Sequence, residues 1–268
     1  MAHLAVPGPF DLALTTERFR AFGVDRVNLW HEGGLHRVVG GREVRIEAAP
    51  GGVDVEPLDA ETEPVVRTVL GLVFELGPFY EWAARDAVLA PATRRLAGFR
   101  PSLAPDPFEM LVGAITAQQV SLFAALAIRN RMIERYGRRV GLAWEFPGRA
   151  ALAGAGEEEL VALGFSRRKA EYTIGLARSE LDLDELAALP DEEVKARLLT
   201  LRGIGEWTAE WFLARHLARP HAWPWGDLAL RKAVAVLYRG LDVREARERF
   251  HPFENLSAHY LLLANRVP

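Results

Sequence analysis

Hydrophobic and polar residues alternate with a period of two in the first part of the chain, which is typical of half-buried strands. Pairs of glycines separate the alternating segments at the spacing of β-hairpins. A helix over 63–75 is expected to lie across the resulting sheet. Residues 1–95 are therefore predicted to form a small antiparallel α+β domain. Its strands are expected over 27–30, 35–39, 44–47 and 53–55.

After this domain the apolar residues recur at helical spacing, and no strand pattern follows. Asp106 is a suitable N-cap with Pro107 in the first turn, and Gly137 suits the end of a helix over 120–136. Residues 96–268 are therefore predicted to be an all-α bundle, which makes the fold class α+β with the sheet first. Further helices are expected over 157–163, 166–179, 191–199, 206–217, 227–238, 243–249 and 253–264.

Composition removes several classes of site. Of the 268 residues, 50% are hydrophobic and 26% charged, and none is Cys. This excludes disulfides, thiolate zinc sites, iron–sulfur clusters and a cysteine nucleophile. No apolar run reaches membrane-spanning length and the N-terminus lacks a basic leader, so we expect a soluble cytoplasmic protein with no membrane partner. The histidines show no metal-site spacing, and His216, His221 and His251 are interpreted as packing or surface groups.

The net charge of −3 argues at first against a nucleic-acid partner. The charge is unevenly distributed, however, with −4 on residues 1–95 and +1 on residues 96–268. Within 129–169, nine Lys and Arg face five Asp and Glu, which leaves +4. This segment could form a basic face for DNA, although arginine-rich helices are more often simply solvated.

A glycine turn joins two of the predicted helices. Gly203-Ile204-Gly205 follows the helix over 191–199, and the next helix opens at Glu206. Glycines let the backbone approach a ligand and aim N–H groups outward, and at a helix N-terminus such donors suit a phosphate. The pattern is typical of a helix–hairpin–helix that holds one DNA strand independently of sequence. A helix–turn–helix corner that needs glycine only for packing is the alternative.

Asp227 begins the helix over 227–238, directly after the Pro- and Gly-containing loop Trp223-Pro224-Trp225-Gly226. In isolation, an acid in this position is most simply a helix N-cap. Here it lies one helix after the glycine turn. The intervening helix would bring its carboxylate back towards a DNA strand held by that turn.

Four segments spread over nearly the whole chain carry a family resemblance, although none of them is specific alone. They are Pro9-Phe10-Asp11-Leu12-Ala13-Leu14, Asp106-Pro107-Phe108-Glu109 with Thr116-Ala117-Gln118-Gln119-Val120-Ser121, Gly203-Ile204-Gly205-Glu206-Trp207-Thr208-Ala209, and Gly226-Asp227-Leu228-Ala229-Leu230-Arg231. Together they resemble the helix–hairpin–helix superfamily of DNA glycosylases, and within it the 3-methyladenine DNA glycosylase II (AlkA) type.

The resemblance implies a base-excision enzyme that flips damaged bases out of duplex DNA and removes alkylated purines of the 3-methyladenine and 7-methylguanine type. Asp227 would be the catalytic residue. Breaking an N-glycosidic bond creates oxocarbenium-like charge on the sugar, which a carboxylate stabilises directly or by helping a water to attack. The hairpin would bind the DNA backbone through Arg202, Gly203, Ile204, Gly205, Glu206 and Thr208.

Trp207 occupies the position just after the hairpin where relatives that also cut the DNA backbone carry a lysine. That lysine attacks the sugar as a Schiff-base nucleophile. Here no Lys lies between the hairpin and Asp227. The resemblance therefore implies a monofunctional enzyme that uses water and has no lyase activity.

A flipped base needs flat walls. Trp207 and Trp211 are four residues apart, hence on one helix face, and match aromatic pocket positions of the AlkA type. The alternative for both is a place in the core. Aromatic walls attract positively charged alkylpurines by cation–π interaction. Trp225, Leu228 and Phe253 are the other predicted pocket residues; some relatives carry Tyr in place of Leu228 and Trp in place of Phe253.

Gln118 and Gln119 match the place where the family inserts a wedge into the gap left by the flipped nucleotide, and a polar surface pair is the alternative. No cofactor is expected, although the resemblance allows a monovalent cation, Na⁺ or K⁺, at the hairpin over 201–205. A monomer suffices for one active site. Two other functions stay open: a glycosylase for another lesion such as hypoxanthine or uracil, and a non-catalytic helix–hairpin–helix DNA-binding protein.

Overall fold

The computed structural model describes residues 1–267, and its first part is an antiparallel sheet with the strand order β1-β5-β4-β3-β2. Four of these strands match the predicted segments. The additional edge strand β1 pairs with β5 from Ala2↔Val55 to Ala5↔Gly52, and its four residues are too few to show a pattern. The strands are β1 (Ala2–Ala5), β2 (Leu29–His31), β3 (Gly34–Val39), β4 (Arg42–Ala49) and β5 (Gly52–Glu56).

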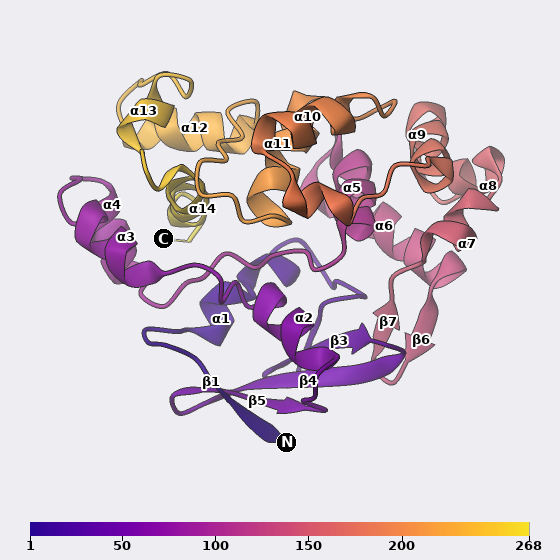
Figure 1. The fold of residues 1–268 in the computed structure, drawn as a ribbon, viewed down its shortest axis with the longest axis horizontal. Helices are drawn as coiled ribbons and strands as arrows, with labels where there is room; N and C mark the ends of the chain where they lie inside the picture. The colour runs from indigo at the N-terminus through magenta and orange to yellow at the C-terminus, as the bar shows by residue number, and fades with distance from the viewer. Residues whose placement is uncertain (268) are drawn as a thin grey trace.

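One helix, α2 (Thr62–Val69), covers the sheet (Figure 1). Its Val66 and Val69 pack in one cluster with strand residues such as Leu35 and Ile46, all of them buried. The helix ends earlier than the predicted 63–75. Gly71 adopts a positive φ of 63° close against the Pro101 carbonyl, a conformation and a contact that only glycine tolerates there.

The rest of the chain is mainly helical and arches over the sheet domain (Figure 1). Short elements near the N-terminus are α1 (Leu12–Thr15) and the 3₁₀ turn η1 (Glu17–Phe19). The helices that follow α2 are α3 (Leu76–Ala83), α4 (Leu89–Arg95), α5 (Pro107–Ala117), α6 (Leu122–Tyr136), α7 (Arg149–Ala153), α8 (Glu157–Ala162), α9 (Arg167–Arg178), the 3₁₀ turn η2 (Glu185–Ala188), α10 (Asp191–Leu199), α11 (Glu206–Arg215), α12 (Leu228–Leu237), α13 (Ala246–Arg249) and α14 (Glu254–Ala264).

One local prediction for the helical part is wrong. β6 (Arg138–Val140) and β7 (Ala143–Glu145) form a short antiparallel hairpin. Gly141 makes its turn with φ 61°, and Trp144 N–H donates to the Arg26 carbonyl at 2.8 Å. Three-residue strands are too short for a period of two to emerge from the sequence. The hairpin attaches the helical part to the sheet domain.

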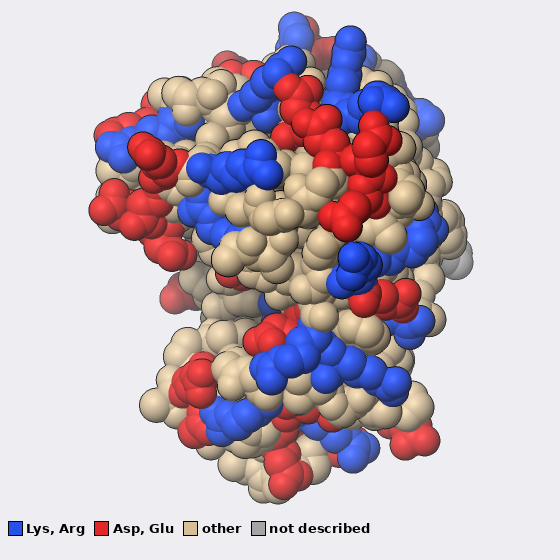
Figure 2. All heavy atoms as spheres, turned by 90° about the vertical axis from the view of Figure 1, so that its right-hand side faces the viewer, with Lys and Arg blue, Asp and Glu red and all other residues tan. Residues whose placement is uncertain are grey.

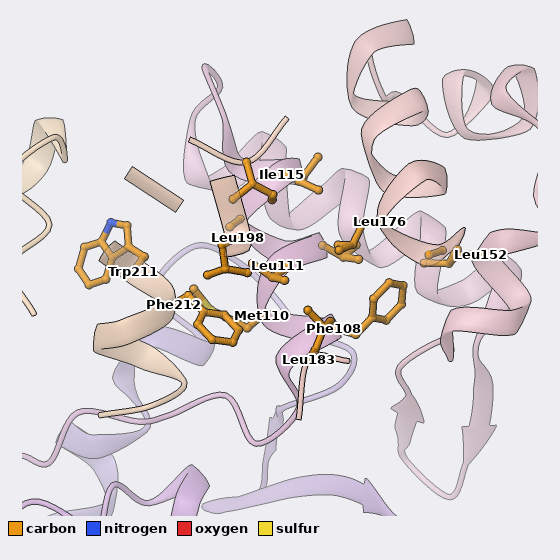
Figure 3. Packing of buried hydrophobic residues seen from close by; sticks show 14 of the residues in the cluster. Phe108, Met110, Leu111, Ile115, Leu152, Leu176, Leu183, Leu198, Trp211 and Phe212 are labelled. Carbon is orange, nitrogen blue, oxygen red and sulfur yellow. The ribbon is translucent and has the colours of Figure 1, made fainter. Parts of the chain in front are cut away.

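Two hydrophobic clusters organise the helical part. The first joins α5, α6 and α9 with α10 and α11, and Figure 3 shows Trp211 and Phe212 of α11 beside Leu198 and Met110 in this cluster. The second joins α12 and α14 with α3 and α4, so the last two helices of the predicted first domain pack against the C-terminal helices. None of the helices within 1–267 is both long and apolar enough to cross a bilayer.

A buried ionic network fastens the sheet domain to the helical part. Glu109 of α5 accepts from Arg37 of β3 at 2.5 Å and from Arg129 of α6 at 2.8 Å. Arg129 also donates to Asp25 at 2.9 Å. Burial alone would raise the pKa of Asp25, but the adjacent Arg129 and the hydrogen bonds to its carboxylate outweigh that and lower it.

The segment 129–169 keeps its excess of basic residues, but some of them are paired with acids of the same segment. Figure 2 shows acidic and basic side chains interspersed on the side of the molecule that lies to the right in Figure 1. Several of the arginines in this segment are in ion pairs with nearby acids. These pairs are Arg135–Glu159, Arg138–Glu145 and Arg167–Glu158.

Candidate active site

Asp227 is the N-cap of α12, and both of its carboxylate oxygens are engaged. Oδ1 accepts from the backbone N–H groups of Ala229 at 2.9 Å and Leu230 at 3.0 Å. Oδ2 accepts from the indole Nε1 of Trp207 and of Trp211, each at 3.1 Å. All four partners are donors, which suits an ionised carboxylate because that group only accepts. Asp227 therefore caps α12 with one oxygen and binds the two tryptophan side chains with the other.

The carboxylate borders a cavity of about 550 Å³, and residues of α5 and α6 line it together with the three segments described next. Trp207 and Trp211 of α11 form one side of it, and His259 and Leu262 of α14 another. The third side comes from the N-terminal domain, through residues between Thr15 and Phe22. A volume of this size accommodates a small organic group such as a nucleobase. The sheet domain thus contributes directly to the candidate site.

Arg215 lies on the same face of α11 as the two tryptophans, and its guanidinium carbon is 3.7 Å from the centroid of the Trp211 ring. Within residues 1–267 no carboxylate lies within ion-pair distance of its guanidinium, and the buried Nε has no hydrogen-bond partner. Burial, and then the charge of the neighbouring Arg18, lowers the pKa of Arg215. One face of Trp211 is therefore already covered by a cation.

His259 supplies a neutral acceptor to the cavity. Its Nδ1 lies 2.9 Å from the Asn255 carbonyl, so Nδ1 carries the proton that this hydrogen bond needs. Burial lowers the pKa of His259 to about 3, and the charge of Arg215 adds to this effect. Nε2 is buried and has no partner among the described residues. A buried acceptor without a partner is costly, and a ligand with an N–H group would satisfy it.

The hairpin has the predicted form, with α10 ending at Leu199 and α11 beginning at Glu206. Gly203 has φ 88° and lies so close to the Tyr172 ring that a Cβ atom would clash with it. Gly205 has open space around its Cα, which leaves the N-terminus of α11 accessible. Ile204 and Thr208 are buried, and their N–H groups donate to the carbonyls of Leu201 and Gly205, so the predicted DNA contact of Thr208 is not supported. Arg202 is exposed and forms an ion pair with Glu171.

The two predicted wedge residues have different positions. Gln118 is the C-cap of α5, and its Nε2 donates to the Gly203 carbonyl at 2.8 Å, which ties α5 to the hairpin. Gln119 is exposed at the junction of α5 and α6 with φ 55°. Its side chain is the one of this pair that is free of the hairpin contact.

The hairpin carbonyls are partly in use. Leu201 O accepts from Ile204 N–H at 3.1 Å, and Gly203 O from Gln118. A carbonyl oxygen has a second lone pair, so both could still ligate a cation. Binding of a monovalent cation by the carbonyls of residues 201–205 therefore stays a prediction.

Three predicted pocket residues lie outside the cavity. Leu228, the first residue of α12, is 63% exposed. Trp225 stacks under Arg244, whose guanidinium carbon is 4.2 Å from its ring centroid. Phe253 packs in the second cluster against Phe79 and Trp82, because the chain before α14 turns towards α3.

Sequence reasoning missed Arg215, His259 and Arg18 as cavity residues. A signal existed for Arg215, because residues 207, 211 and 215 repeat at a spacing of four and share a helix face. No local pattern marks Arg18 or His259, which tertiary packing brings to the cavity from opposite ends of the chain.

Known proteins resemble this chain in sequence and in fold. The family described as HhH-GPD superfamily base excision DNA repair protein matches residues 112–255. The DNA-3-methyladenine glycosylase 2 of Escherichia coli is 33% identical, over 74% of this chain and 72% of its own. A 3-methyladenine DNA-glycosylase structure from Archaeoglobus fulgidus has a TM-score of 0.89 at 30% identity, covering 99% of this chain and 98% of that chain.

The chain covers less of some other relatives. The DNA-3-methyladenine glycosylase of Bacillus subtilis is 32% identical over 61% of this chain, a match that spans 56% of its own length. The match to a second B. subtilis relative, a putative DNA-3-methyladenine glycosylase, covers 50% of the length of that relative. The activity, substrates and partners of the whole protein are therefore matters of proposal.

Proposed function

Because the chain belongs to the HhH-GPD superfamily of base excision DNA repair proteins, we propose that it hydrolyses the N-glycosidic bond of alkylated purines in duplex DNA. The observation that carries the proposal is the Asp227 carboxylate, held at a cavity beside an accessible helix–hairpin–helix. A protein that only gripped DNA could use Asp227 as a helix cap, but would have no reason to place its negative charge at a cavity near phosphates, which it repels.

The hydrogen bonds of Asp227 favour an electrostatic role. As the bond to the base breaks, positive charge develops on the sugar, and a fixed carboxylate stabilises it without reorganising. The four N–H donors hold the carboxylate in place and occupy two acceptor positions on each oxygen. It is therefore better placed to act by its charge than to take a proton from water.

DNA would be held by the N-terminus of α11, whose free N–H groups suit a phosphate. Gly205 leaves the approach open, and Arg202 lies next to it. Gln119 would fill the space of the flipped nucleotide, while Gln118 holds the hairpin in position. A single chain contains every part of this site, so we propose a monomer acting on damaged duplex DNA.

The charged and polar residues that line the cavity would influence which bases the protein removes. Trp211 is shielded by Arg215, so cation–π attraction for a charged alkylpurine comes mainly from Trp207. Arg215 itself repels a cationic base. The polar groups Arg215 and His259 would compensate by hydrogen bonding to the edge of the base.

Arg215→Met keeps apolar contact with Trp211 and removes the charge, so it should favour charged bases. Two unit charges a few ångströms apart in a half-buried site interact by on the order of 1–3 kcal/mol. We expect the ratio of single-turnover excision rates, 7-methylguanine over uncharged hypoxanthine, to rise about tenfold. Arg197→Met, which alters an exposed pair on α10, should leave the ratio unchanged. An unchanged ratio in Arg215→Met would show that Arg215 does not face the base.

We also propose that the reaction stops at an abasic site. Among residues 1–267 no lysine lines the cavity, and Lys169, which is buried, donates instead to the Thr116 carbonyl at 2.9 Å. A Schiff base with the sugar requires an amine within reach. Borohydride added during turnover should therefore trap no protein–DNA adduct, and strands should stay intact until alkali is added. A trapped adduct would contradict a purely hydrolytic reaction.

The proposed function is tested with duplexes that carry one 3-methyladenine, 7-methylguanine, hypoxanthine or uracil. We expect alkali-labile sites at the two alkylated purines and none in undamaged duplex. Product only at uracil or hypoxanthine would leave a glycosylase of another specificity. No product at any lesion would refute the enzyme and leave a DNA-binding protein.

A further inference from the structure

A second cluster of chemically active side chains lies outside the cavity. His221 belongs to the loop between α11 and α12, His251 to the loop between α13 and α14, and Glu254 is the first residue of α14. One ligating atom from each of the three lies within 4.8 Å of the other two. His251 and Glu254 are three residues apart, but His221 lies 33 residues before Glu254, which explains why spacing gave no sign of the cluster.

The geometry centres on the Glu254 carboxylate. Oε2 lies 3.0 Å from His221 Nδ1, and Oε1 lies 3.2 Å from His251 Nδ1. The two imidazole rings are stacked with centroids 5.1 Å apart and planes inclined by 19°, so both present Nδ1 to the same carboxylate. Tetrahedral sites with metal–ligand bonds of about 2.0–2.1 Å need ligand atoms about 3.3 Å apart. The two nitrogen–oxygen separations, 3.0 and 3.2 Å and each to a different oxygen of Glu254, are close to this spacing, and one ligating atom from each residue lies within 4.8 Å of the others.

Burial makes the cluster unusual for a surface ion pair. The Glu254 side chain is only 5% exposed, whereas the two histidines are open to solvent. Within residues 1–267 its ion-pair partners are these two imidazoles alone. A buried carboxylate requires a compensating cation or full hydrogen bonding. Neutral imidazoles provide only the hydrogen bonds, and a bound metal ion would provide the charge.

The surrounding backbone holds the three residues in register. Asn255 donates from its backbone to the Pro220 carbonyl at 3.0 Å, and from its side chain to the Arg219 carbonyl at 2.9 Å. These bonds dock the loop before His221 onto the start of α14. Arg247 donates to the His221 carbonyl at 3.4 Å, and its positive charge opposes a bound cation.

We propose that His221, His251 and Glu254 bind a transition-metal dication, with Zn²⁺ as the best match. Two imidazole nitrogens and one carboxylate are a ligand set that zinc uses, with a fourth position left for water. Mg²⁺ and Ca²⁺ require mainly oxygen ligands and are a poor match. The ion would join the loop that leads to Asp227 with the helix that carries His259.

Zn²⁺ binding can be measured without interference from thiolates, because the chain contains no cysteine. Calorimetric titration of the metal-free full chain with Zn²⁺ should show one saturable site, and Zn²⁺ but not Mg²⁺ should raise Tm. His221→Ala and His251→Ala should each weaken binding at least about tenfold, since loss of a ligand exceeds the effect of a lost supporting contact. Each variant also removes one hydrogen bond from the buried Glu254 carboxylate, so the metal-free variants should melt somewhat below the wild type, and binding is compared at a temperature where all are folded.

His3→Ala is the matched control, because His3 is also an exposed histidine that pairs with a carboxylate, Asp54, at 3.0 Å. It should bind Zn²⁺ like the wild type. Cobalt substitution should give the strong visible absorption of a four-coordinate site in the wild type and in His3→Ala, but not in His221→Ala or His251→Ala. The proposal is overturned if the wild type shows no saturable Zn²⁺ binding, or if both histidine variants bind Zn²⁺ as tightly as the wild type.

Discussion

Asp227→Asn is expected to lower the single-turnover rate of base release by at least about 100-fold, with little change in DNA affinity. Electrostatic groups that act on transition-state charge contribute on the order of 10²–10³ in rate. Asparagine keeps the Oδ1 acceptor that caps α12 but loses the negative charge. Binding should persist because the hairpin and its phosphate contacts are untouched.

The substitution also has a structural cost that must be measured. The asparagine amide would present N–H groups to the indole N–H groups of Trp207 and Trp211, where Oδ2 now accepts. Losing these bonds should cost about 1–3 kcal/mol of stability. Asp242→Asn is the control, since Asp242 also caps a backbone N–H, that of Arg244, but lies outside the cavity. If a folded Asp227→Asn variant kept the wild-type rate, Asp227 would not be the catalytic group.

Glu109→Ala is expected to destabilise the protein by about 3–5 kcal/mol, the largest stability effect we predict. Its carboxylate compensates two guanidinium groups, Arg37 and Arg129, in the buried network between the sheet domain and the helices. Removing one partner of a buried ion pair leaves uncompensated charge in a low dielectric. Urea unfolding followed by tryptophan fluorescence gives the free energy of unfolding.

Glu134→Ala is the matched comparison. Glu134 also pairs with an arginine of the N-terminal domain, Arg26, at 2.7 Å, but both side chains are well exposed. Exposed pairs contribute about 0–1 kcal/mol, so this variant should unfold almost like the wild type. Equal effects of the two substitutions would mean that burial of the Glu109 network does not stabilise the domain junction.

The sequence predicted the elements that have a strong local signal. Gly203 and Gly205 between two predicted helices indicated the hairpin, and the strands of the sheet followed from alternation and paired glycines. Asp227 could be identified from the sequence because the loop before it and the family resemblance together indicated a catalytic role in addition to that of a helix cap. The β6–β7 hairpin was missed because it is too short to show a period.

Contacts between distant segments were not accessible in this way. Arg18 and His259 reach the cavity only because the N-terminal domain and α14 converge on α11. Phe253 matched a pocket position by sequence, yet the local path of the chain directs its ring towards α3. The clustering of His221 with His251 likewise depends on two loops that meet at α14. A sequence pattern indicates which face of a helix or strand is buried, but not which other segments pack against that face.

The central claim is that the chain releases an intact alkylated base with the help of Asp227. Mass-spectrometric detection of free 7-methylguanine, released from a duplex with one such lesion, tests it most directly. We predict that wild type releases the free base while the DNA strand stays whole, and that Asp227→Asn releases at least about 100-fold less per unit time. Absence of free base with the wild-type protein, or equal release by both proteins, would contradict the account.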